Sequence, residues 1–256
     1  MKHKRDGTLS GNHGVNMNPF QILNVDSEVF GFPVAKIIPD KLTQGELEQV
    51  ISCLKKENVR LVFWASNPND EESQRAAKLC NGFLADRKVT YVIDIEHISK
   101  QSESFGWLIE EYADTLPCTD LEDLAIQVGE YSRFRVDPRI PEDKFVALYK
   151  LWIRNSVNKQ VADAVLVVRQ SGKIVGMVTV GKKNERGDIG LFAVDSGMRG
   201  GKLGTALVSG AQEWARRKGF RFAQVVTQGE NVAACRLYEK CGYHIDKIEF
   251  FYHFWI

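Results

Sequence analysis

A strand, a glycine-rich turn and the start of a helix follow one another in residues 189–205, and this succession constrains the fold more than any other stretch. The residues are Ile-Gly-Leu-Phe-Ala-Val-Asp-Ser-Gly-Met-Arg-Gly-Gly-Lys-Leu-Gly-Thr. The apolar run is typical of a buried strand. At a helix start, backbone N–H groups without partners and the positive end of the helix dipole are directed at one point. Because glycine lets an anion approach such amides closely, the stretch predicts a phosphate-binding turn.

The helix after the turn is predicted from its apolar spacing. Its apolar face comprises Leu203, Ala206, Leu207, Gly210, Ala211 and Trp214, and Gly219 follows its end. The turn has neither the G-x-G-x-x-G pattern of dinucleotide-binding folds nor the G-x-x-x-x-G-K-[ST] pattern of P-loops. Taken alone, the stretch favours an ordinary strand–turn–helix corner without a ligand, so the interpretation depends on the rest of the chain.

A second segment changes that interpretation. The strand-like run 222–227 precedes residues 231–243, which read Asn-Val-Ala-Ala-Cys-Arg-Leu-Tyr-Glu-Lys-Cys-Gly-Tyr. An R-x-x-x-x-G-T turn after one strand and an N-x-x-A-x-x-L-Y-x-x-x-G-Y helix after the next resemble the GNAT superfamily of acyl-CoA-dependent N-acetyltransferases. The resemblance covers residues 121–256. It implies an α/β (mixed α+β) fold with a central mixed sheet whose strands are splayed apart.

The expected elements of the C-terminal half follow the order of that fold. They are a strand at 124–129, a helix at 142–155, a hairpin of 164–169 and 173–180, a strand at 188–194, a helix at 202–218, a strand at 221–227, a helix at 231–241 and a terminal strand at 247–256. The preceding half alternates between strands (20–23, 34–38, 61–64, 88–95) and helices (44–57, 70–81), with a loop at 26–33, which predicts a smaller N-terminal α/β module.

Domain boundaries follow from the breaks in these patterns. Polar stretches at 97–106 and 115–119 indicate a linker. We therefore expect a flexible tail over residues 1–18, an N-terminal α/β module over 19–118 and a GNAT N-acetyltransferase domain over 119–256.

The resemblance implies acetyl-CoA as the cosubstrate, without a metal. It assigns the coenzyme pyrophosphate to backbone N–H groups of Arg199, Gly200, Gly201, Lys202, Leu203, Gly204 and Thr205. It assigns the pantetheine arm to the free backbone groups of Leu191, Phe192, Ala193 and Val194, which also polarise the thioester carbonyl. Family members usually carry R/Q-x-x-G-x-G/A in the turn, and here Lys202 replaces the middle glycine.

Tyr238 is the expected general acid, because the family places a tyrosine at this point of the helix. A phenol, with an ordinary pKa of about 10, stays protonated at neutral pH and can protonate the CoA sulfur. Simple packing beneath the sheet is the alternative. Asn231 is expected to cap the helix and to contact CoA or the acceptor. The implied mechanism is direct transfer in a ternary complex, since Cys235 has no evident histidine partner.

Residues 23–32, 130–137 and 252–256 extend the resemblance to dTDP-fucosamine acetyltransferases. The implied acceptor is the amino group of dTDP-4-amino-4,6-dideoxygalactose. Tyr131, Arg133 and Phe134 are expected to face this nucleotide amino sugar from the loop after strand 124–129. Arg133 or Arg135 is expected either to meet the diphosphate or to form a structural ion pair. The base stays open: the candidates are Glu130, Asp137, Glu185 and Asp188, and an amine that arrives neutral needs none.

Composition restricts the other possible classes. A net charge of +1 over 256 residues gives no reason to expect nucleic acid or a membrane as partner. There is no apolar run of membrane-spanning length. Five cysteines without a C-x-x-C pattern are typical of reduced thiols in a cytoplasmic protein. The apolar segment 250–256 suggests strand pairing in a homodimer. The remaining alternatives are a GNAT enzyme for another small amine or a protein N-terminus, and a non-catalytic acyl-CoA sensor.

Overall fold

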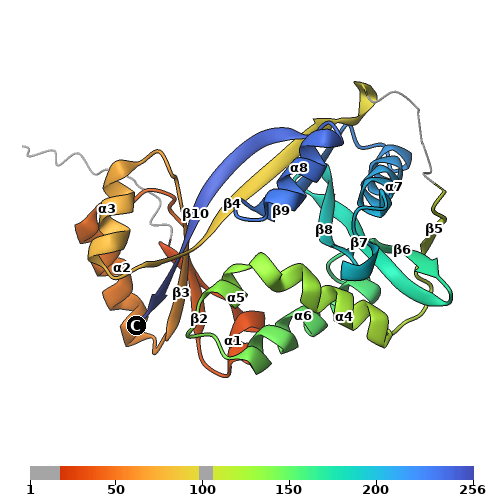
Figure 1. Cartoon of the computed structure of the whole chain (residues 1–256). Coiled ribbons are helices and arrows are strands. Elements are labelled where there is room, and N and C mark those ends of the chain that lie inside the picture. The colour runs from red at the N-terminus through yellow and green to blue at the C-terminus, as the bar shows by residue number, and fades with distance from the viewer. Residues whose placement is uncertain (1–17, 98–105) are drawn as a thin grey trace, which may run out of the picture.

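The computed structural model describes residues 18–97 and 106–256, and in these ranges the strands form one mixed sheet (Figure 1). The strand order is β1-β2-β3-β10-β4-β9-β8-β7-β6-β5. The strands are β1 (Phe20–Ile22), β2 (Val34–Ile37), β3 (Leu61–Ser66), β4 (Phe83–Asp94), β5 (Ile109–Glu111), β6 (Ala164–Gln170), β7 (Lys173–Lys183), β8 (Arg186–Val194), β9 (Phe222–Gln228) and β10 (His244–Trp255). The pairs β2/β3 and β8/β9 are parallel, and the other neighbours are antiparallel.

Some of the helices begin at a residue whose side chain caps them. They are α1 (Asn24–Phe30), α2 (Gln44–Lys56), α3 (Glu71–Leu79), α4 (Thr119–Val128), α5 (Arg133–Val136), α6 (Glu142–Val157), α7 (Leu203–Arg217) and α8 (Val232–Lys240). A reciprocal capping box of Thr43 and Glu46 starts α2. The Asp70 carboxylate accepts from the Ser73 N–H (3.1 Å) at the start of α3. Helices α2 and α3 thus lie close to the predicted ranges.

Helices cover both faces of the sheet. At the β5 end, α7 and α8 pack on one face through residues such as Leu207 and Tyr238, and α4 and α6 cover the other through Leu124 and Ile153. At the β1 end, α2 and α3 cover one face. The opposite face there packs against α1, α5 and the beginning of α6. The fold is therefore three-layered and of the mixed α/β class that we predicted.

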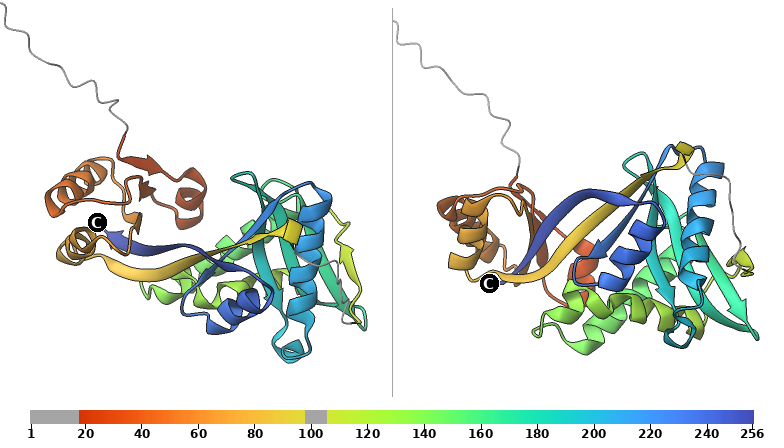
Figure 2. Two further views of the ribbon diagram at one scale, coloured as in Figure 1. Left: turned by 90° about the horizontal axis from the view of Figure 1, so that it is seen from above. Right: turned by 45° about the horizontal axis from the view of Figure 1, so that its top comes forward.

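Two long strands and one helix join the halves of the molecule. Strands β4 and β10 pair with each other along most of their length and extend from the half with α2 and α3 to the half with α7 and α8 (Figures 1 and 2). Helix α6 contributes Leu148 to the core at the β1 end and Ile153 to the core at the β5 end. The division at residue 118 stays a prediction, and the predicted tail lies outside the described residues except for Asn18.

Two local predictions were wrong. Much of the loop expected at 26–33 belongs to helix α1, which ends at Phe30 and is followed by Gly31 in the left-handed conformation (φ +77°). Only Phe30 of this helix is buried, so the sequence shows no apolar face. The strand expected at 124–129 is the end of helix α4, whose buried residues Leu121, Leu124 and Ala125 have helical spacing.

The end of the chain also differs from expectation. Strand β10 lies between β3 and β4, and both of its edges are paired over Phe250–His253. Over these four residues no backbone edge is free, so the predicted strand pairing with a second subunit is not available to them, and the homodimer stays a prediction. The short strand β5, which pairs with β6, was not predicted.

Candidate functional site

The parallel strands β8 and β9 separate along their length and open a space between them. They pair only from Gly187 opposite Ala223 to Ile189 opposite Val225. Beyond this point β8 continues to Val194 and β9 to Gln228 without mutual pairing. The backbone of Gly190–Val194 therefore presents N–H and C=O groups along one side of the opening, as the predicted splay requires.

An irregularity between β7 and β8 coincides with the start of this opening. The register shifts between Val178 and Val180. The side chain of Thr179 occupies the bulge and accepts from the Leu191 N–H (2.8 Å). A Cβ on Gly190 would lie 2.6 Å from Thr179 Oγ1, so only glycine fits there without movement. The Thr179–Gly190 contact thus sets where β8 bends away from β9.

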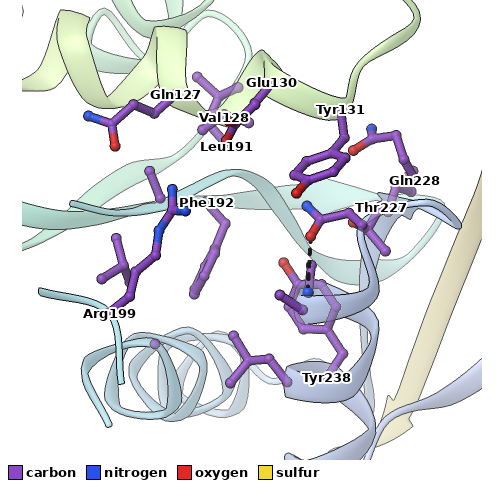
Figure 3. Close-up of a pocket in the computed structure, with 18 of the residues that line it drawn as sticks. Gln127, Val128, Glu130, Tyr131, Leu191, Phe192, Arg199, Thr227, Gln228 and Tyr238 are labelled. Atoms are coloured by element: carbon purple, nitrogen blue, oxygen red, sulfur yellow. Dashed lines mark hydrogen bonds between the residues drawn. The ribbon is translucent and has the colours of Figure 1, made fainter. Parts of the chain in front are cut away.

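A cavity of about 550 Å³ occupies the opening (Figure 3). Its lining comes from α4, the turn after it, α6, β8, the β8–α7 turn, the end of β9 and α8. Twelve of the predicted site residues line it: Tyr131, Leu191, Phe192, Ala193, Val194, Arg199, Gly200, Lys202, Gly204, Thr205, Asn231 and Tyr238. The tertiary structure therefore brings together segments that are more than a hundred residues apart in the sequence.

The β8–α7 turn carries the backbone donors at one end of the cavity. No side chain of the N-cap residue caps α7, so the amides of Leu203, Gly204 and Thr205 are the first-turn donors that intrahelical bonding leaves over. Trp107 Nε1–H donates to the Gly201 carbonyl (3.2 Å) and anchors the turn from the other side. The helix dipole adds positive potential at this point, which suits an anion.

Lys202 adopts a backbone conformation that glycine takes up more readily than other residues. Its φ of +60° and ψ of +4° lie in the left-handed region, which a residue with a Cβ adopts only at a cost in free energy. Gly200, two residues earlier, has φ +85°. The turn therefore contains two left-handed residues, Gly200 and Lys202, just before helix α7 begins.

Helix α8 places Tyr238 deep in the cavity. The Asn231 side chain accepts from the Ala234 N–H (3.1 Å) and caps the helix, as we predicted. Figure 3 shows the Tyr238 ring extending from α8 toward the space beside Phe192, and the two ring centroids are 6.0 Å apart. Only 3% of Tyr238 is exposed, and burial raises the pKa of its hydroxyl well above the ordinary phenol value.

The wall opposite the α7 turn is aromatic and polar. It contains Gln127, Glu130 and Tyr131 from the end of α4 and the turn after it, and Tyr149 and Trp152 from α6 (Figure 3 labels the first three). Gln127 Oε1 is buried and has no hydrogen-bond partner among the described residues. A buried polar atom of this kind is usually satisfied, and so it indicates a ligand or water at the wall.

Two of the predicted acceptor residues lie behind this wall. Phe134 is 2% exposed and packs against Phe63 and Trp152, with centroid distances of 5.8 and 5.7 Å. The Arg133 guanidinium carbon lies 4.2 Å from the centre of the Phe134 ring. Neither residue lines the cavity. Because α5 is a single turn pressed against β4, these side chains point inward, and only Tyr131 faces the space.

The four candidate bases are distributed over different parts of the structure. Glu130 lines the cavity. Asp137 is buried and bonded to His253 and Trp255. Glu185 is exposed and paired with Lys182 (2.8 Å). Asp188 accepts from Gln224 Nε2–H (2.7 Å), and burial raises its pKa.

Several cavity residues were missed by the sequence analysis. Gln127 lies in the segment that was predicted as a strand, and Tyr149 and Trp152 lie on α6, whose apolar spacing predicts only core packing. Thr227 and Gln228 end the predicted strand before α8. Their position at the carboxyl end of a strand next to a helix N-terminus was the available signal.

Comparison with known proteins agrees with this geometry. Residues 121–243 match the model of the acetyltransferase (GNAT) family. The matched segment begins in α4 and includes the separated strands, the α7 turn and α8. The family model thus covers just under half of the chain, and this is the part that holds the cavity.

Two curated proteins are similar to parts of this chain. The chain is 27% identical over 124 residues to the spore coat polysaccharide biosynthesis protein SpsD of Bacillus subtilis. This match covers 48% of this chain and 43% of SpsD. It is 31% identical over 111 residues to the uncharacterized N-acetyltransferase MJ1207 of Methanocaldococcus jannaschii. This match covers 40% of this chain and 49% of MJ1207. The chain therefore spans less than half the length of each of these relatives.

A solved structure extends the likeness to the whole fold. A GCN5-related N-acetyltransferase from Sphaerobacter thermophilus superposes with a TM-score of 0.62 over 92% of this chain and 75% of that chain, at 15% identity. At this identity the likeness shows a common fold. Across residues 18–97 and 106–256, no helix is long and apolar enough to cross a bilayer, and no three His, Cys, Asp or Glu side chains gather as around a metal ion.

Proposed function

We propose that the protein is an acetyl-CoA-dependent N-acetyltransferase that acts on the amino group of a nucleotide-linked amino sugar, with dTDP-4-amino-4,6-dideoxygalactose as the favoured acceptor. One observation carries the proposal. A single cavity of about 550 Å³ connects the first-turn amides of α7, the open edge of β8 and the Tyr238 side chain. This is the order in which pyrophosphate, pantetheine and thioester follow one another in the coenzyme.

The coenzyme is held mainly by backbone groups. The amides of Leu203, Gly204 and Thr205 donate to the pyrophosphate, where the helix dipole also favours negative charge. The edge of β8 at Leu191–Val194 pairs with the pantetheine amides as an additional strand does. Because backbone groups do the binding, the apolar side chains of β8 remain free to pack in the core.

Transfer takes place directly from coenzyme to acceptor. The neutral amine attacks the thioester carbon, and β8 amides stabilise the oxygen that becomes negative. The carbon–sulfur bond then breaks, and the Tyr238 hydroxyl donates its proton to the leaving sulfur. The raised pKa of Tyr238 keeps this hydroxyl protonated until a thiolate forms next to it.

The wall opposite the α7 turn, which we call the acceptor wall, supports a sugar as the substrate. Tyr131, Tyr149 and Trp152 offer aromatic faces to the apolar C–H side of a pyranose ring, and Gln127 and Glu130 offer hydrogen-bonding groups to its hydroxyls. The similarity to a protein named for polysaccharide biosynthesis supports the same class.

Two measurements test the proposal. Titration calorimetry with CoA is expected to show binding. Mass spectrometry of incubations with acetyl-CoA is expected to show an added acetyl group on dTDP-4-amino-4,6-dideoxygalactose. Peptides and aminoglycosides are expected to stay unmodified in the same assay. CoA binding with acetylation of peptides alone would assign another acceptor class. CoA binding without any acetylated amine would favour a sensor, and no CoA binding would refute the proposal entirely.

A further inference from the structure

Within the described residues, the two halves of the chain contain the same succession of elements at the same spacing. Helices α3 and α8 have 9 residues each, and strands β4 and β10 have 12 residues each. The offset from the start of α3 at Glu71 to the start of α8 at Val232 is 161 residues, and it is the same between β3 and β9, between β4 and β10 and between the ends of α2 and α7. We call residues 34–94 the first unit and residues 186–255 the second unit, and Figure 1 shows α2 and α3 of the first on one side of the β4/β10 pair and α7 and α8 of the second on the other.

The local geometry repeats at the same offset. Asp70 and its counterpart Asn231 both cap a helix by accepting from the N–H group three residues later. Asn81 and its counterpart Gly242 both follow that helix with a positive φ, of +60° and +90°. Few side chains repeat, however. Over residues 41–94 and 202–255 six aligned residues are identical: Lys41 and Lys202, Leu42 and Leu203, Arg60 and Arg221, Arg75 and Arg236, Cys80 and Cys241, and Tyr91 and Tyr252.

The sheet pairs the two units about an approximate two-fold axis. The strand order β2-β3-β10-β4-β9-β8 stays the same when every strand is replaced by its counterpart and the order is read backwards. His244 lies opposite Val92, and the counterparts of these two residues, Phe83 and His253, also lie opposite each other. Such reciprocal pairing is the property of an interface between two subunits related by a two-fold axis.

The centre of this symmetry lies at Lys88 and Glu249, which are each other's counterparts, pair in the sheet and form an ion pair (2.9 Å). The register shifts are symmetric as well, since Asp246 on β10 and its counterpart Ala85 on β4 are both passed over in the pairing. Strand β4 pairs with β9 and strand β10 with β3, so each unit supplies a strand to the sheet of the other. The contact between the units therefore has the form of a dimer interface with exchanged strands.

The first unit has a closed helix start where the second unit has the α7 turn. The Thr43 N–H donates to Glu46 Oε2 (2.8 Å), and the Glu46 N–H donates to Thr43 Oγ1 (3.3 Å). The Leu42 N–H donates to Ser73 Oγ (2.9 Å). Side chains thus satisfy these amides at the start of α2, and the Glu46 carboxylate occupies the place where an anion is favoured. No side chain of the N-cap residue caps α7.

The cavity of the second unit has a much smaller counterpart in the first. All four residues of β2 pair with β3, so β2 has no open edge toward β3 like that of β8. The counterpart of Tyr238 is Ala77, which is fully buried in the core between α2, α3 and the sheet. Ser66, the counterpart of Thr227, lines a cavity of about 230 Å³, compared with about 550 Å³ for the cavity that Thr227 lines. Carboxylates in the lining of the smaller cavity also disfavour a phosphate: Asp40, Asp246 and Glu249.

The remaining edges of the described sheet are unsuited to pairing with another chain. The strands at its two ends, β1 and β5, have three residues each. The part of β10 that β3 does not cover, residues 244–249, is interrupted at Asp246. Short end strands and bulges are features by which proteins prevent pairing between sheet edges.

We propose that the first unit is a closed copy of the coenzyme-binding unit and that it takes the place of a second subunit. One chain is then a complete monomer with one coenzyme site, in place of the homodimer that the sequence suggested. The statement about the coenzyme rests on the proposed function, whereas the statement about the monomer does not.

Titration calorimetry of the full chain with CoA tests the closed copy. We expect one CoA per chain. Thr205→Glu places a carboxylate in the first turn of α7 and is expected to weaken CoA binding by about 100-fold or more. Gln44→Glu is the matched control, because it makes the same change at the counterpart position in α2. Since we expect no coenzyme to bind there, CoA affinity is expected to change by less than about twofold.

Molar mass in solution tests the monomer. Light scattering coupled to gel filtration is expected to give the mass of one chain, 29.0 kDa, from about 1 to about 100 μM protein. Acetylation per mole of chain is expected to be constant over the same range. A protein with twice this mass, or an activity per chain that falls on dilution, would overturn the monomer.

The results separate this inference from the function on which part of it rests. Two CoA per chain, or CoA binding that Gln44→Glu weakens as much as Thr205→Glu, would overturn the closed copy and leave the proposed function intact. A chain that binds no CoA would refute the proposed function, and with it the description of the first unit as a copy of a coenzyme-binding unit. The molar mass then still decides whether one chain is complete by itself.

Discussion

At the scale of single residues, the proposed role of Tyr238 is the one that a substitution tests most directly. Its ring is packed by Phe192, Tyr91 and Tyr243, each with its centroid 6.0 Å away, so the hydroxyl is held in one direction. A side chain held this firmly can lose its oxygen without losing its position. The contribution of the hydroxyl is therefore separable from that of the ring.

Tyr238→Phe is expected to lower kcat by about 100-fold or more, because the leaving sulfur loses its proton donor. CoA affinity is expected to stay the same, since in the proposed complex backbone groups bind the coenzyme. Steady-state kinetics and calorimetry measure the two quantities. Tyr243→Phe is the control, because Tyr243 packs against Tyr238 but does not line the cavity. Equal turnover in both variants would remove Tyr238 from the mechanism.

Lys202 supplies a second prediction at the residue scale. Its φ of +60° costs about 1 kcal/mol for a residue with a Cβ and nothing for glycine. We expect Lys202→Gly to be more stable than Lys202→Ala by about 1 kcal/mol in chemical denaturation. Because both variants lose the lysine side chain, the difference isolates the backbone. Both are expected to bind CoA modestly more weakly than the wild type, and equal stability of the two would contradict the backbone argument.

At the scale of elements, the cavity depends on where β8 leaves β9. The parallel pairing ends at Ile189, and the next residue is Gly190, whose Cα faces Thr179 across the bulge. Thr179 accepts from the Leu191 N–H and so satisfies one amide of a strand that has lost its other neighbour. Strand β8 therefore changes from paired to unpaired on its β9 side within the three residues 189–191.

Gly190→Ala is expected to destabilise the protein by about 1–3 kcal/mol, because the new Cβ overlaps Thr179 Oγ1. Rotation of Thr179 relieves the overlap but breaks the bond to Leu191, so CoA affinity is expected to fall as well. Thermal denaturation and calorimetry measure both effects. Gly45→Ala in α2 is the control, since no atom lies within 4 Å of the added carbon and alanine favours helix. If Gly190→Ala has the same stability and CoA affinity as the wild type, the bulge accommodates the added carbon without cost, contrary to this prediction.

At the scale of the whole molecule, a buried network joins the last strand to the segment after α5. His253 on β10 is fully buried, with Nδ1 2.8 Å from Asp137 Oδ2. Trp255 Nε1–H donates to the same oxygen (2.9 Å), and Arg139 Nε–H donates to Oδ1 (3.1 Å). Burial tends to raise the pKa of Asp137, but these hydrogen bonds lower it well below its usual range.

This network makes stability depend on pH. Burial lowers the pKa of His253 to about 4 in the folded protein, whereas an unfolded histidine titrates near its ordinary value of about 6.5. Since the unfolded chain binds this proton first, stability is expected to fall by up to about 3 kcal/mol as the pH drops from 7 to 4. Urea denaturation at a series of pH values measures it. His253→Asn is expected to make the free energy of unfolding depend less on pH between 7 and 4. If the pH dependence is the same as in the wild type, groups other than His253 cause it.

Much of the cavity could be predicted from the chain before its folding was known. The α7 turn, strand β8 and the capped helix of Tyr238 are local patterns, in which glycine positions, apolar spacing and a capping asparagine act within a few residues of one another. Local patterns of this kind also misled, because the apolar run at Leu124 fits a short strand as well as the end of a helix.

The acceptor wall and the charges behind it could not be predicted in this way. Asp86 and Arg133 become neighbours only because β4, from the N-terminal half, lies between β10 and β9 while α5 packs on its face. Such pairing over long stretches of chain depends on which apolar surfaces cover one another, and no local sequence pattern records it. The amino-acid order thus defined the glycine-rich turn before α7 and the position of Tyr238, the proposed acid. Folding in three dimensions chose which polar groups face the acceptor, because burial and proximity arise only when distant strands and helices pack together.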